Sequence, residues 1–348
     1  MATKRRKRKP GRTQVWVGWS DEKLLDLRFK DLDLSLSGTL VESCVEDLGA
    51  ELEARGVRFR PHVWLSAEWM SPLGVPGIAI PFYLAHPRLA RLERRQLLEV
   101  EGGTRKECMK ILRHECGHAV QQAYRLQRRR RWQQLFGSST KPYPDAYRPN
   151  PASKRFVQHL RMYYAQSHPD EDFAETFAVW MGPRTRWRKR YAGWPALDKL
   201  EFVDETMAEI GAQPAAVRSR EHVEPLGSNT KTLRKHYAER RGRFQPSAVS
   251  SYDRHLRALF TPEADAPDAE RATRFLTRNR GEIRRLVSRW TGEYQFTLDM
   301  VLAEMIVRCR ELGLRAVGDE EQMRMDFAVV LTVNTMHSLY SKSSWVAL

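Results

Sequence analysis

The sequence predicts an α+β protein in which a domain with a small mixed sheet and one long motif-bearing helix is followed by an all-α C-terminal domain. Three observations predict this class. Residues 57–69 alternate and are rich in β-formers. The motif HECGH at residues 114–118 lies within a helical pattern. Further long helical patterns fill the C-terminal part of the chain.

Length and composition indicate more than one domain. The chain has 348 residues, and 41% of them are hydrophobic, which is enough for two ordinary cores. We expect a catalytic domain at residues 14–212, a basic linker at 213–243 and a helical domain at 244–348. The four cysteines form no CxxC pair, which indicates free thiols in a reducing compartment. Cys116 is expected to serve packing.

The formal net charge is +16, and seven of the basic residues precede the first acid, Asp21. Residues 1–13 are therefore expected to form a disordered basic arm. Through residues 4–12 it could bind nucleic acid or an acidic partner weakly, act as a nuclear signal, or only aid solubility. No apolar segment follows it and no run of about 18 apolar residues occurs. We therefore expect a cytoplasmic protein without a signal peptide or membrane span.

Elements before the motif are predicted from periodicity and punctuation. Residues 39–55 carry one apolar stripe and predict a helix. Residues 57–69 predict a strand. The segment 71–89 contains four prolines, so we expect it at a sheet edge or as a loop over a cleft. Near Gly77–Leu84 it would either pair with substrate as an added strand or simply cover the core.

The motif helix is expected to begin at a capping box formed by Thr104 and Glu107. We expect it to continue through residues 125–136. The arginines at 128–131 are typical of a solvated helix face, and a patch for substrate or nucleic acid is the alternative. Residues 137–153 are rich in Pro, Ser and Tyr and predict a long loop.

All later elements are predicted to be helices. Ser153 would cap a helix over residues 156–166. Pro169 is typical of a first helical position, and the acids after it suit a first turn, so a second helix is expected to run from there to Gly182. The C-terminal helices are expected at residues 269–290, 295–313 and 320–340.

The HExxH motif offers two metal ligands and a base. Residues four apart share one face of a helix, so His114 and His118 can bind one ion. Glu115 can take a proton from water on that ion, as in a zinc hydrolase. The motif alone is equally compatible with an ordinary surface helix.

A catalytic zinc site also needs a third protein ligand. The HExxHxxGxxH class is excluded, because its glycine and histidine positions hold Gln121 and Tyr124. A carboxylate of the second helix is the remaining candidate. Glu171 and Glu175 share a face there, so one could bind metal while the other accepts a hydrogen bond from a zinc-binding His. Spacing alone does not decide which of the two binds the metal. Acids at the start of a helix are also typical caps that are favoured by the helix dipole. Asp170 and Asp172 lie nearby, but on other faces of the helix.

HECGH, followed by Tyr164 and then by HPDEDFAETFAVW, resembles the gluzincin metallopeptidases, with an active-site pattern similar to that of anthrax lethal factor. It looks closest to the bacterial family called "putative zinc-binding metallopeptidases", over roughly residues 100–185. The resemblance implies a zincin-like fold, one Zn²⁺ ion and Glu171 as the third ligand. It also implies that Glu175 is the hydrogen-bond partner of a ligand.

The resemblance further implies that Tyr164 assists catalysis by stabilising an oxyanion. Two neighbours could take this role instead. Tyr163 is adjacent in the chain, and His168 lies a few residues downstream. The choice among the three stays open in the sequence.

Together these features predict a zinc-dependent hydrolase that cleaves peptide or other amide bonds of a peptide or protein substrate. Metal-activated water would attack, with Glu115 as general base. The alternative is a non-catalytic, metal-containing binding protein that engages nucleic acid or an acidic partner through its basic arm and helical domain. Glu115 favours the enzyme, because a structural site has no need of a base.

Overall fold

The computed structural model describes residues 14–183, 185–243, 252–340 and 346–347. The protein is α+β, with mostly helices and little sheet. The predicted basic arm, residues 1–13, lies outside the described residues. Within the described ranges, no helix is both long and apolar enough to cross a membrane.

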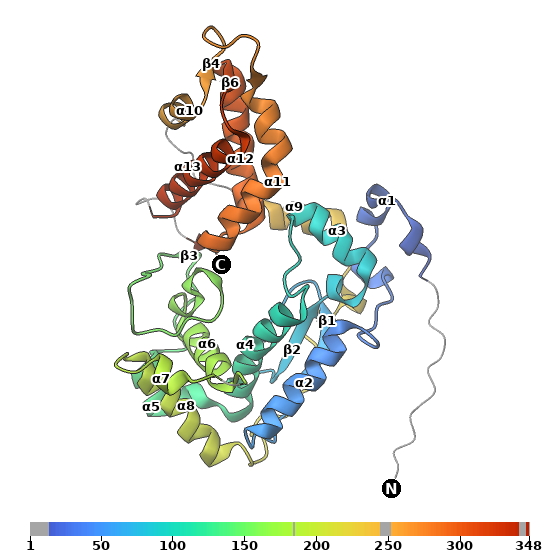
Figure 1. Ribbon diagram of the computed structural model, residues 1–348. Coiled ribbons are helices and arrows are strands. Elements are labelled where there is room, and N and C mark those ends of the chain that lie inside the picture. Colours follow the sequence, from blue (N-terminus) through green and yellow to red (C-terminus); the bar gives the residue numbers. More distant parts are fainter. Residues whose placement is uncertain (1–13, 184, 244–251, 341–345, 348) are drawn as a thin grey trace.

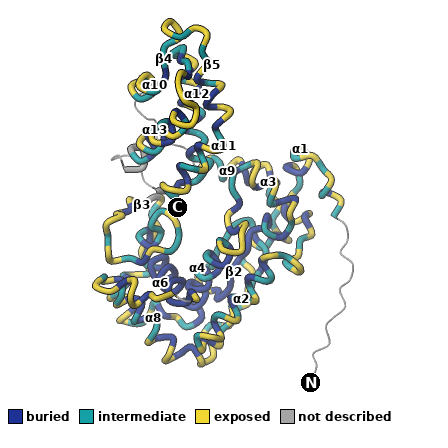
Figure 2. The backbone as a smooth tube through the Cα atoms, viewed as in Figure 1, coloured by how far each residue is buried: buried dark blue, intermediate teal, exposed yellow. Residues whose placement is uncertain are grey.

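The largest core surrounds helix α4 (Arg105–Tyr124). Helices α2 (Leu40–Ala54) and α6 (Pro169–Met181) pack against it, and α8 (Ala196–Ile210) packs against α6. Most of the predicted stripe of α2 is buried in this core, but Leu40 is exposed. Figure 2 shows this buried region in the lower part of the molecule. The polar motif residues of α4 therefore lie on a helix that the core holds on several sides.

Two short parallel strands flank this core, β1 (His62–Ser66) and β2 (Gly77–Pro81). The predicted strand over residues 57–69 is thus shortened. All five residues of β2 are buried, and Met70 bridges Ala79 in antiparallel fashion. Strand β2 is thus paired with neighbouring chain on both edges and covers the core, which agrees with the second of the two alternatives for Gly77–Leu84.

Two predicted helical segments are interrupted. Helix α4 ends at Tyr124 because Arg125 takes a left-handed conformation with φ 54°. A 3-10 turn η4 (Leu126–Arg128) and a separate helix α5 (Arg130–Phe136) follow. The predicted helix over residues 156–166 is replaced by a 3-10 segment, η5 (Arg161–Gln166), in which Met162 and Tyr163 have positive φ.

A second hydrophobic cluster joins the N-terminal residues to α3 (Pro87–Leu97) and α9 (Leu233–Gly242). A buried ion pair between Glu93 and Arg240, 2.7 Å apart, connects these two helices. The predicted linker at 213–243 therefore includes a helix that packs against α3. The smaller elements of this region are η1 (Val15–Gly18), α1 (Asp21–Leu25), η2 (Phe29–Asp31), η3 (Phe82–Ala85), α7 (Trp187–Arg190) and η6 (Leu226–Ser228).

The C-terminal part has its own hydrophobic cluster, drawn from residues 252–331. It packs α10 (Asp253–Leu259), α11 (Ala272–Thr291), α12 (Gln295–Glu311) and α13 (Glu320–Tyr340) together (Figure 1). The all-α expectation is wrong in one respect, because three short strands join these helices in an antiparallel sheet of order β4-β6-β5. They are β4 (Thr261–Pro262), β5 (Glu270–Arg271) and β6 (Leu314–Ala316).

Residues 346–347 lie beside the loop that follows α5. Strand β7 (Val346–Ala347) pairs antiparallel with β3 (Ala146–Tyr147), which lies in the long loop after α5. Figure 1 shows the chain end beside β3, below the C-terminal helices. The two parts of the molecule are thus linked by backbone pairing as well as by the chain.

Candidate metal centre

Helices α4 and α6 approach each other closely at a glycine. A Cβ atom on Gly117 would lie only 2.7 Å from the Cα atom of Ala174, so only glycine permits this spacing. Helix α4 begins at the predicted cap, where Thr104 accepts a hydrogen bond from the amide of Glu107. Helix α6 begins at Pro169 as predicted. The close contact brings side chains of the two helices within reach of one metal ion.

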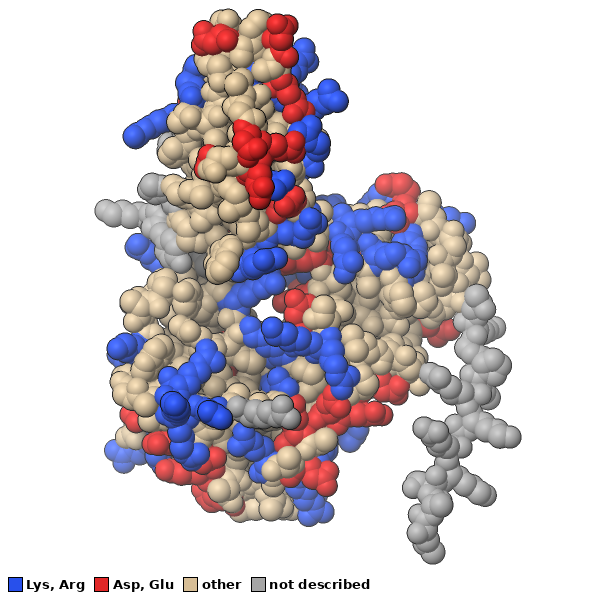
Figure 3. All heavy atoms as spheres, in the orientation of Figure 1, with Lys and Arg blue, Asp and Glu red and all other residues tan. Residues whose placement is uncertain are grey.

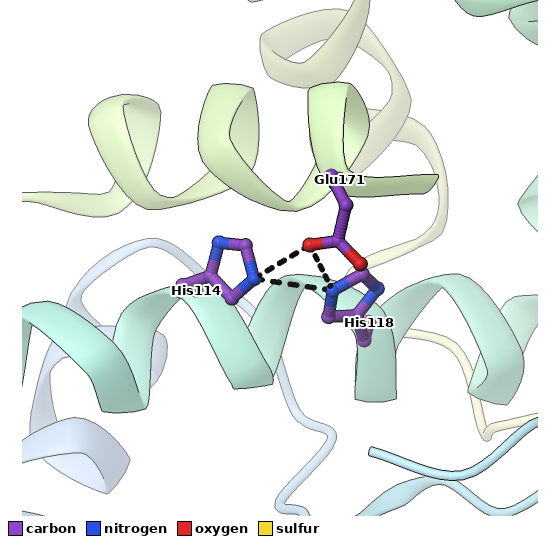
Figure 4. Close-up of side chains that lie close together, drawn as sticks. All are labelled: His114, His118 and Glu171. Carbon is purple, nitrogen blue, oxygen red and sulfur yellow. Dashed lines mark hydrogen bonds and ion pairs between the residues drawn. The ribbon is translucent and has the colours of Figure 1, made fainter. Parts of the chain in front are cut away.

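Three donor atoms converge between these helices (Figure 4). The Nε2 atoms of His114 and His118 are 3.2 Å apart, and Glu171 Oε2 lies 3.0 Å from the first and 3.1 Å from the second. A tetrahedral zinc ion with bonds of about 2.0–2.1 Å holds neighbouring ligand atoms about 3.3 Å apart. The triangle therefore fits zinc with only slight expansion. We call these three residues the metal centre.

Glu175 lies behind the metal centre, one turn after Glu171 on α6. Its Oε1 atom is 2.9 Å from His114 Nδ1, and its Oε2 atom accepts a hydrogen bond from the amide of Leu160. When Nδ1 of His114 donates its proton to Glu175, Nε2 carries the lone pair, which points toward the metal-binding atoms of His118 and Glu171. The structure thus brings together Glu175 and His114 as the hydrogen-bond prediction requires.

The buried carboxylates of Glu171 and Glu175 need a positive charge beside them. Burial alone would lower the pKa of His114, but hydrogen bonds to Glu171 and Glu175 outweigh it and hold that pKa well above its usual value. Burial likewise disfavours the Glu171 carboxylate, yet His118 and His114 keep its pKa well below the usual range. The pKa of Glu175 is lowered too, despite its burial, chiefly by its hydrogen bond with His114. The carboxylates of Glu171 and Glu175 are therefore both ionised, and a proton or a metal dication must balance their charge.

Glu115 lines a cavity that opens next to the metal centre. The cavity has a volume of about 1760 Å³, and His114, His118 and Glu171 also line it. Among the described residues, no hydrogen bond or ion pair reaches the Glu115 carboxylate. The described residues bring three metal donors together, and the open side of the centre faces this cavity. Structural zinc sites are closed by four protein ligands, whereas this group of three donors has an open side.

The predicted oxyanion groups lie in different surroundings. Tyr164 lines the cavity, with its ring 5.7 Å from that of His114. Tyr163 is not among the cavity-lining residues. His168 already uses both ring nitrogens, because Nδ1 accepts from the Asp170 amide and Nε2 donates to the Lys141 carbonyl.

A residue that sequence reasoning missed also reaches the metal centre. Tyr143 donates a hydrogen bond of 2.9 Å to Glu171 Oε1, and its ring stacks on His168 at 3.9 Å. It comes from the loop predicted only as irregular chain, where no local signal marks it. Burial, together with nearby carboxylates that include Glu171, raises the pKa of both Tyr143 and Tyr164, so both phenols remain protonated donors.

The remaining acids of α6 bind elsewhere. Asp170 accepts hydrogen bonds from Gln121 and Ser139. Asp172 pairs with Lys199 of α8 at 2.5 Å. Neither belongs to the metal centre. Cys116 is fully buried, and burial raises the pKa of its thiol, which suits the packing role expected for it.

Comparison with known proteins agrees with this zinc-binding donor set. Residues 91–185 match the model of a family described as "Putative zinc-binding metallo-peptidase". The matched region contains the metal centre, Glu115, Tyr143, Tyr164 and Glu175. No curated protein and no solved structure matches the chain.

Proposed function

We propose that this protein is a zinc-dependent peptidase of the gluzincin type, with His114, His118 and Glu171 as the ligands of one Zn²⁺ ion. The observation that carries the proposal is the triangle of donor atoms with sides of 3.0 to 3.2 Å, open on one side to the cavity that Glu115 lines. The family match over residues 91–185 supports the same class. The natural substrate is a peptide or protein.

The domain organisation is part of this proposal. A zincin-like catalytic domain would occupy residues 14–212, the linker 213–243 and the helical domain 244–348. Support comes from the hydrophobic clusters, because the cluster of residues 252–331 contains no residue of the core around α4. Helix α9, within the linker, packs with the catalytic side.

Zinc bound at this centre supplies Lewis-acid chemistry, which acidifies water at neutral pH and polarises a carbonyl group. The residues of the chain do the remaining work. The unpartnered carboxylate of Glu115 accepts the proton of the attacking water and returns it to the leaving amine. The hydroxyl group of Tyr164, kept protonated by burial, donates to the oxyanion of the tetrahedral intermediate. Tyr143 holds Glu171 in place through its hydrogen bond.

An extended substrate would bind along residues 69–71. Trp69, Met70 and Ser71 line the cavity, and Met70 is extended where it bridges Ala79. Ser71 also donates a hydrogen bond to the carbonyl oxygen of Glu115, which ties this segment to the motif helix. Backbone pairing here would hold the scissile bond beside the metal centre.

The substitution Glu115→Gln tests the proposal. The variant should keep full zinc content, because Glu115 is not a ligand, and should lose about 10³-fold or more in peptide hydrolysis, because the amide cannot accept the proton. Zinc is measured by elemental analysis and hydrolysis on a random peptide library by mass spectrometry. Glu209→Gln, at a surface ion pair, is the matched control and should leave both unchanged.

Two results would contradict the proposal. If Glu115→Gln still hydrolysed peptides at the wild-type rate, Glu115 would not be the general base. Wild-type protein that binds zinc but cleaves no member of the library would favour the non-catalytic binding protein. In that case the metal centre would serve recognition or stability alone.

A further inference from the structure

The wall of the cavity carries many cations without partners. Arg161 and Arg284 line the cavity and pair with Glu99 and Asp299. In the described part of the chain, no ion pair is found for the other cavity-lining cations, Arg94, Lys106, Lys110, Arg128, Lys141 and Arg285. Figure 3 shows Lys and Arg side chains gathered around the hollow between the two parts of the molecule.

Two of these cations are placed in register with the metal centre. Lys106, Lys110, His114, His118 and Gln122 all line the cavity and follow each other at intervals of four residues along α4. They therefore form one stripe on the face of the helix that looks into the cavity. At 1.5 Å per residue, the lysines lie about 6 and 12 Å from His114 along the helix axis.

Among the described residues, no acid at this end of the cavity forms an ion pair with these lysines. Glu99 is held by Arg161. Glu107, which is hydrogen-bonded to Thr104 at the helix cap, and Glu175 attract Lys110 only from beyond ion-pair distance. Glu101 also lines the cavity but is exposed to solvent, which screens its charge. Burial, together with the neighbouring cations Arg161 and Lys106, lowers the pKa of Lys110 despite the opposing effect of Glu175 and Glu107.

The facing wall comes from the C-terminal helices. Arg284 and Arg285, near the end of α11, line the cavity together with Tyr294 and Gln295 at the start of α12. Arg284 is anchored to Asp299 at 2.7 Å. Arg285 has no ion-pair partner within the described ranges and is available to a ligand in the cavity.

We propose that the cavity selects peptides with acidic side chains on the side of the scissile bond that lies toward the N-terminus of α4, where Lys106 and Lys110 receive the carboxylates, while Arg285 adds positive charge to the same cavity. This deepens the proposed function and rests on it. An extended peptide rises about 3.3 Å per residue, so the two lysines match side chains about two to four residues from the scissile bond. Opposite charges there increase both encounter rate and specificity.

Peptide pairs that differ only in charge test the inference. Hydrolysis is measured for peptides with glutamate at positions two to four residues from the cleaved bond, on either side, and for the same peptides with glutamine. We expect kcat/KM to be about tenfold higher for glutamate on one side at low salt, as two partly solvated ion pairs would provide. The ratio should approach one in 0.5 M salt, which screens such pairs.

Charge-reversal variants locate the effect. In Lys106→Glu combined with Lys110→Glu, the glutamate preference should vanish or invert, with zinc content as the check on folding. Lys189→Glu, on exposed α7, makes the same type of charge change outside the cavity and should keep the preference. Equal rates for glutamate and glutamine peptides, or a preference that survives the double substitution, would overturn the inference.

A binding assay separates this inference from the proposed function. Fluorescence anisotropy of labelled glutamate and glutamine peptides on the zinc-loaded Glu115→Gln variant needs no hydrolysis. Tighter binding of the glutamate peptides, with no cleavage by wild type, would retain the inference and reject the peptidase. Cleavage of the peptides together with equal binding of the glutamate and glutamine peptides would retain the peptidase and reject the inference. A labelled single-stranded oligonucleotide that binds more tightly than every peptide, and is released by the double substitution, would assign the cavity to nucleic acid instead.

Discussion

Individual side chains decide what chemistry the metal centre supports. Tyr143 and Tyr164 place two phenol groups near it, but in different states. The hydroxyl of Tyr143 is committed to Glu171, and its ring is stacked on His168. Tyr164 lines the cavity, and no hydrogen bond of its hydroxyl is found in the described ranges. The first is placed to hold a ligand and the second to meet a substrate.

Single hydroxyl deletions distinguish these two roles. Tyr164→Phe should keep zinc and lower kcat about 10²-fold, because one oxyanion donor is lost. Tyr143→Phe should instead weaken zinc binding about tenfold, because Glu171 loses its support. Tyr163→Phe removes the adjacent hydroxyl and should change neither. Steady-state kinetics and competition with a zinc chelator measure the two effects, and a large loss of kcat in Tyr163→Phe would exchange the assignments of the two adjacent tyrosines.

A surface carboxylate gives a prediction for stability against pH. Burial raises the pKa of Asp21, but hydrogen bonds from Arg95 and Arg88 outweigh it, so the pKa in the folded protein lies below 3.8. A depressed pKa stabilises the folded state where the carboxylate is ionised, and this contribution disappears as pH falls through the folded pKa.

Asp21→Asn should therefore lower the free energy of unfolding by about 1 kcal/mol at pH 7, since the pair is partly solvated. The difference from wild type should shrink as pH falls below 3.8. Urea denaturation at several pH values measures it. Asp31→Asn, for which no ion pair is found among the described residues, is the control and should show no such trend. A difference that grows with acid would be inconsistent with the depressed pKa.

Helices α4 and α6 form the scaffold of the centre, and their separation is fixed by Gly117. Because ligands come from both helices, any increase in their spacing moves Glu171 away from the two histidines. The ion pair of Arg113 with Glu51, at 2.6 Å, also fastens α4 to α2 on another side. The motif helix is therefore held by its neighbours along its length and has little freedom to adjust.

Gly117→Ala tests this scaffold. The added Cβ would come within 2.7 Å of Ala174 Cα, so the helices must separate. We expect a loss of about 2 kcal/mol in stability and weaker zinc binding. Gly242→Ala is the matched control, because its Cβ meets nothing within 4 Å, and it should be neutral or slightly stabilising. Unchanged zinc affinity in Gly117→Ala would show that the helices can adjust.

The sequence predicts well those elements whose ends are marked by particular residues nearby in the chain. The start of α4 follows from Thr104 and the start of α6 from Pro169, and with them come the positions of the two histidines and Glu171. The break after Tyr124 and the 3-10 segment η5 depend on contacts between distant residues. Examples are Leu160 with Glu175 and Tyr147 with Met162. A local sequence pattern cannot predict such contacts. It cannot predict the contact of Tyr143 with Glu171 either.

At the scale of the whole molecule, two of the hydrophobic clusters carry the walls of one cavity. The core around α4 carries the metal centre, whereas the cluster of residues 252–331 carries the facing wall. Sequence periodicity indicated both groups of helices but could not place them around a common cavity. The positive charge of the cavity depends on this arrangement, because Lys106 and Arg285 are far apart in the sequence and line the same cavity.

Zinc should affect the two cores unequally. A ligand that binds only the folded state stabilises it by about 4 kcal/mol at a thousandfold excess over its Kd. In calorimetry we expect two transitions, and added zinc should raise the midpoint of only one by about 10 °C. Chelation should reverse the shift. A single transition that moves as a whole with zinc would show that the two cores unfold as one unit, against the proposed domain boundaries.

The division of the cavity between two cores also bears on how such a protein can diversify. Arg285 and Tyr294 lie on helices whose packing involves neither His114 nor Glu171. Substitutions in that wall can therefore accumulate without disturbing the residues that hold the metal. Related chains could therefore differ in what their cavity accepts, through changes in α11 and α12, and still share the same metal centre.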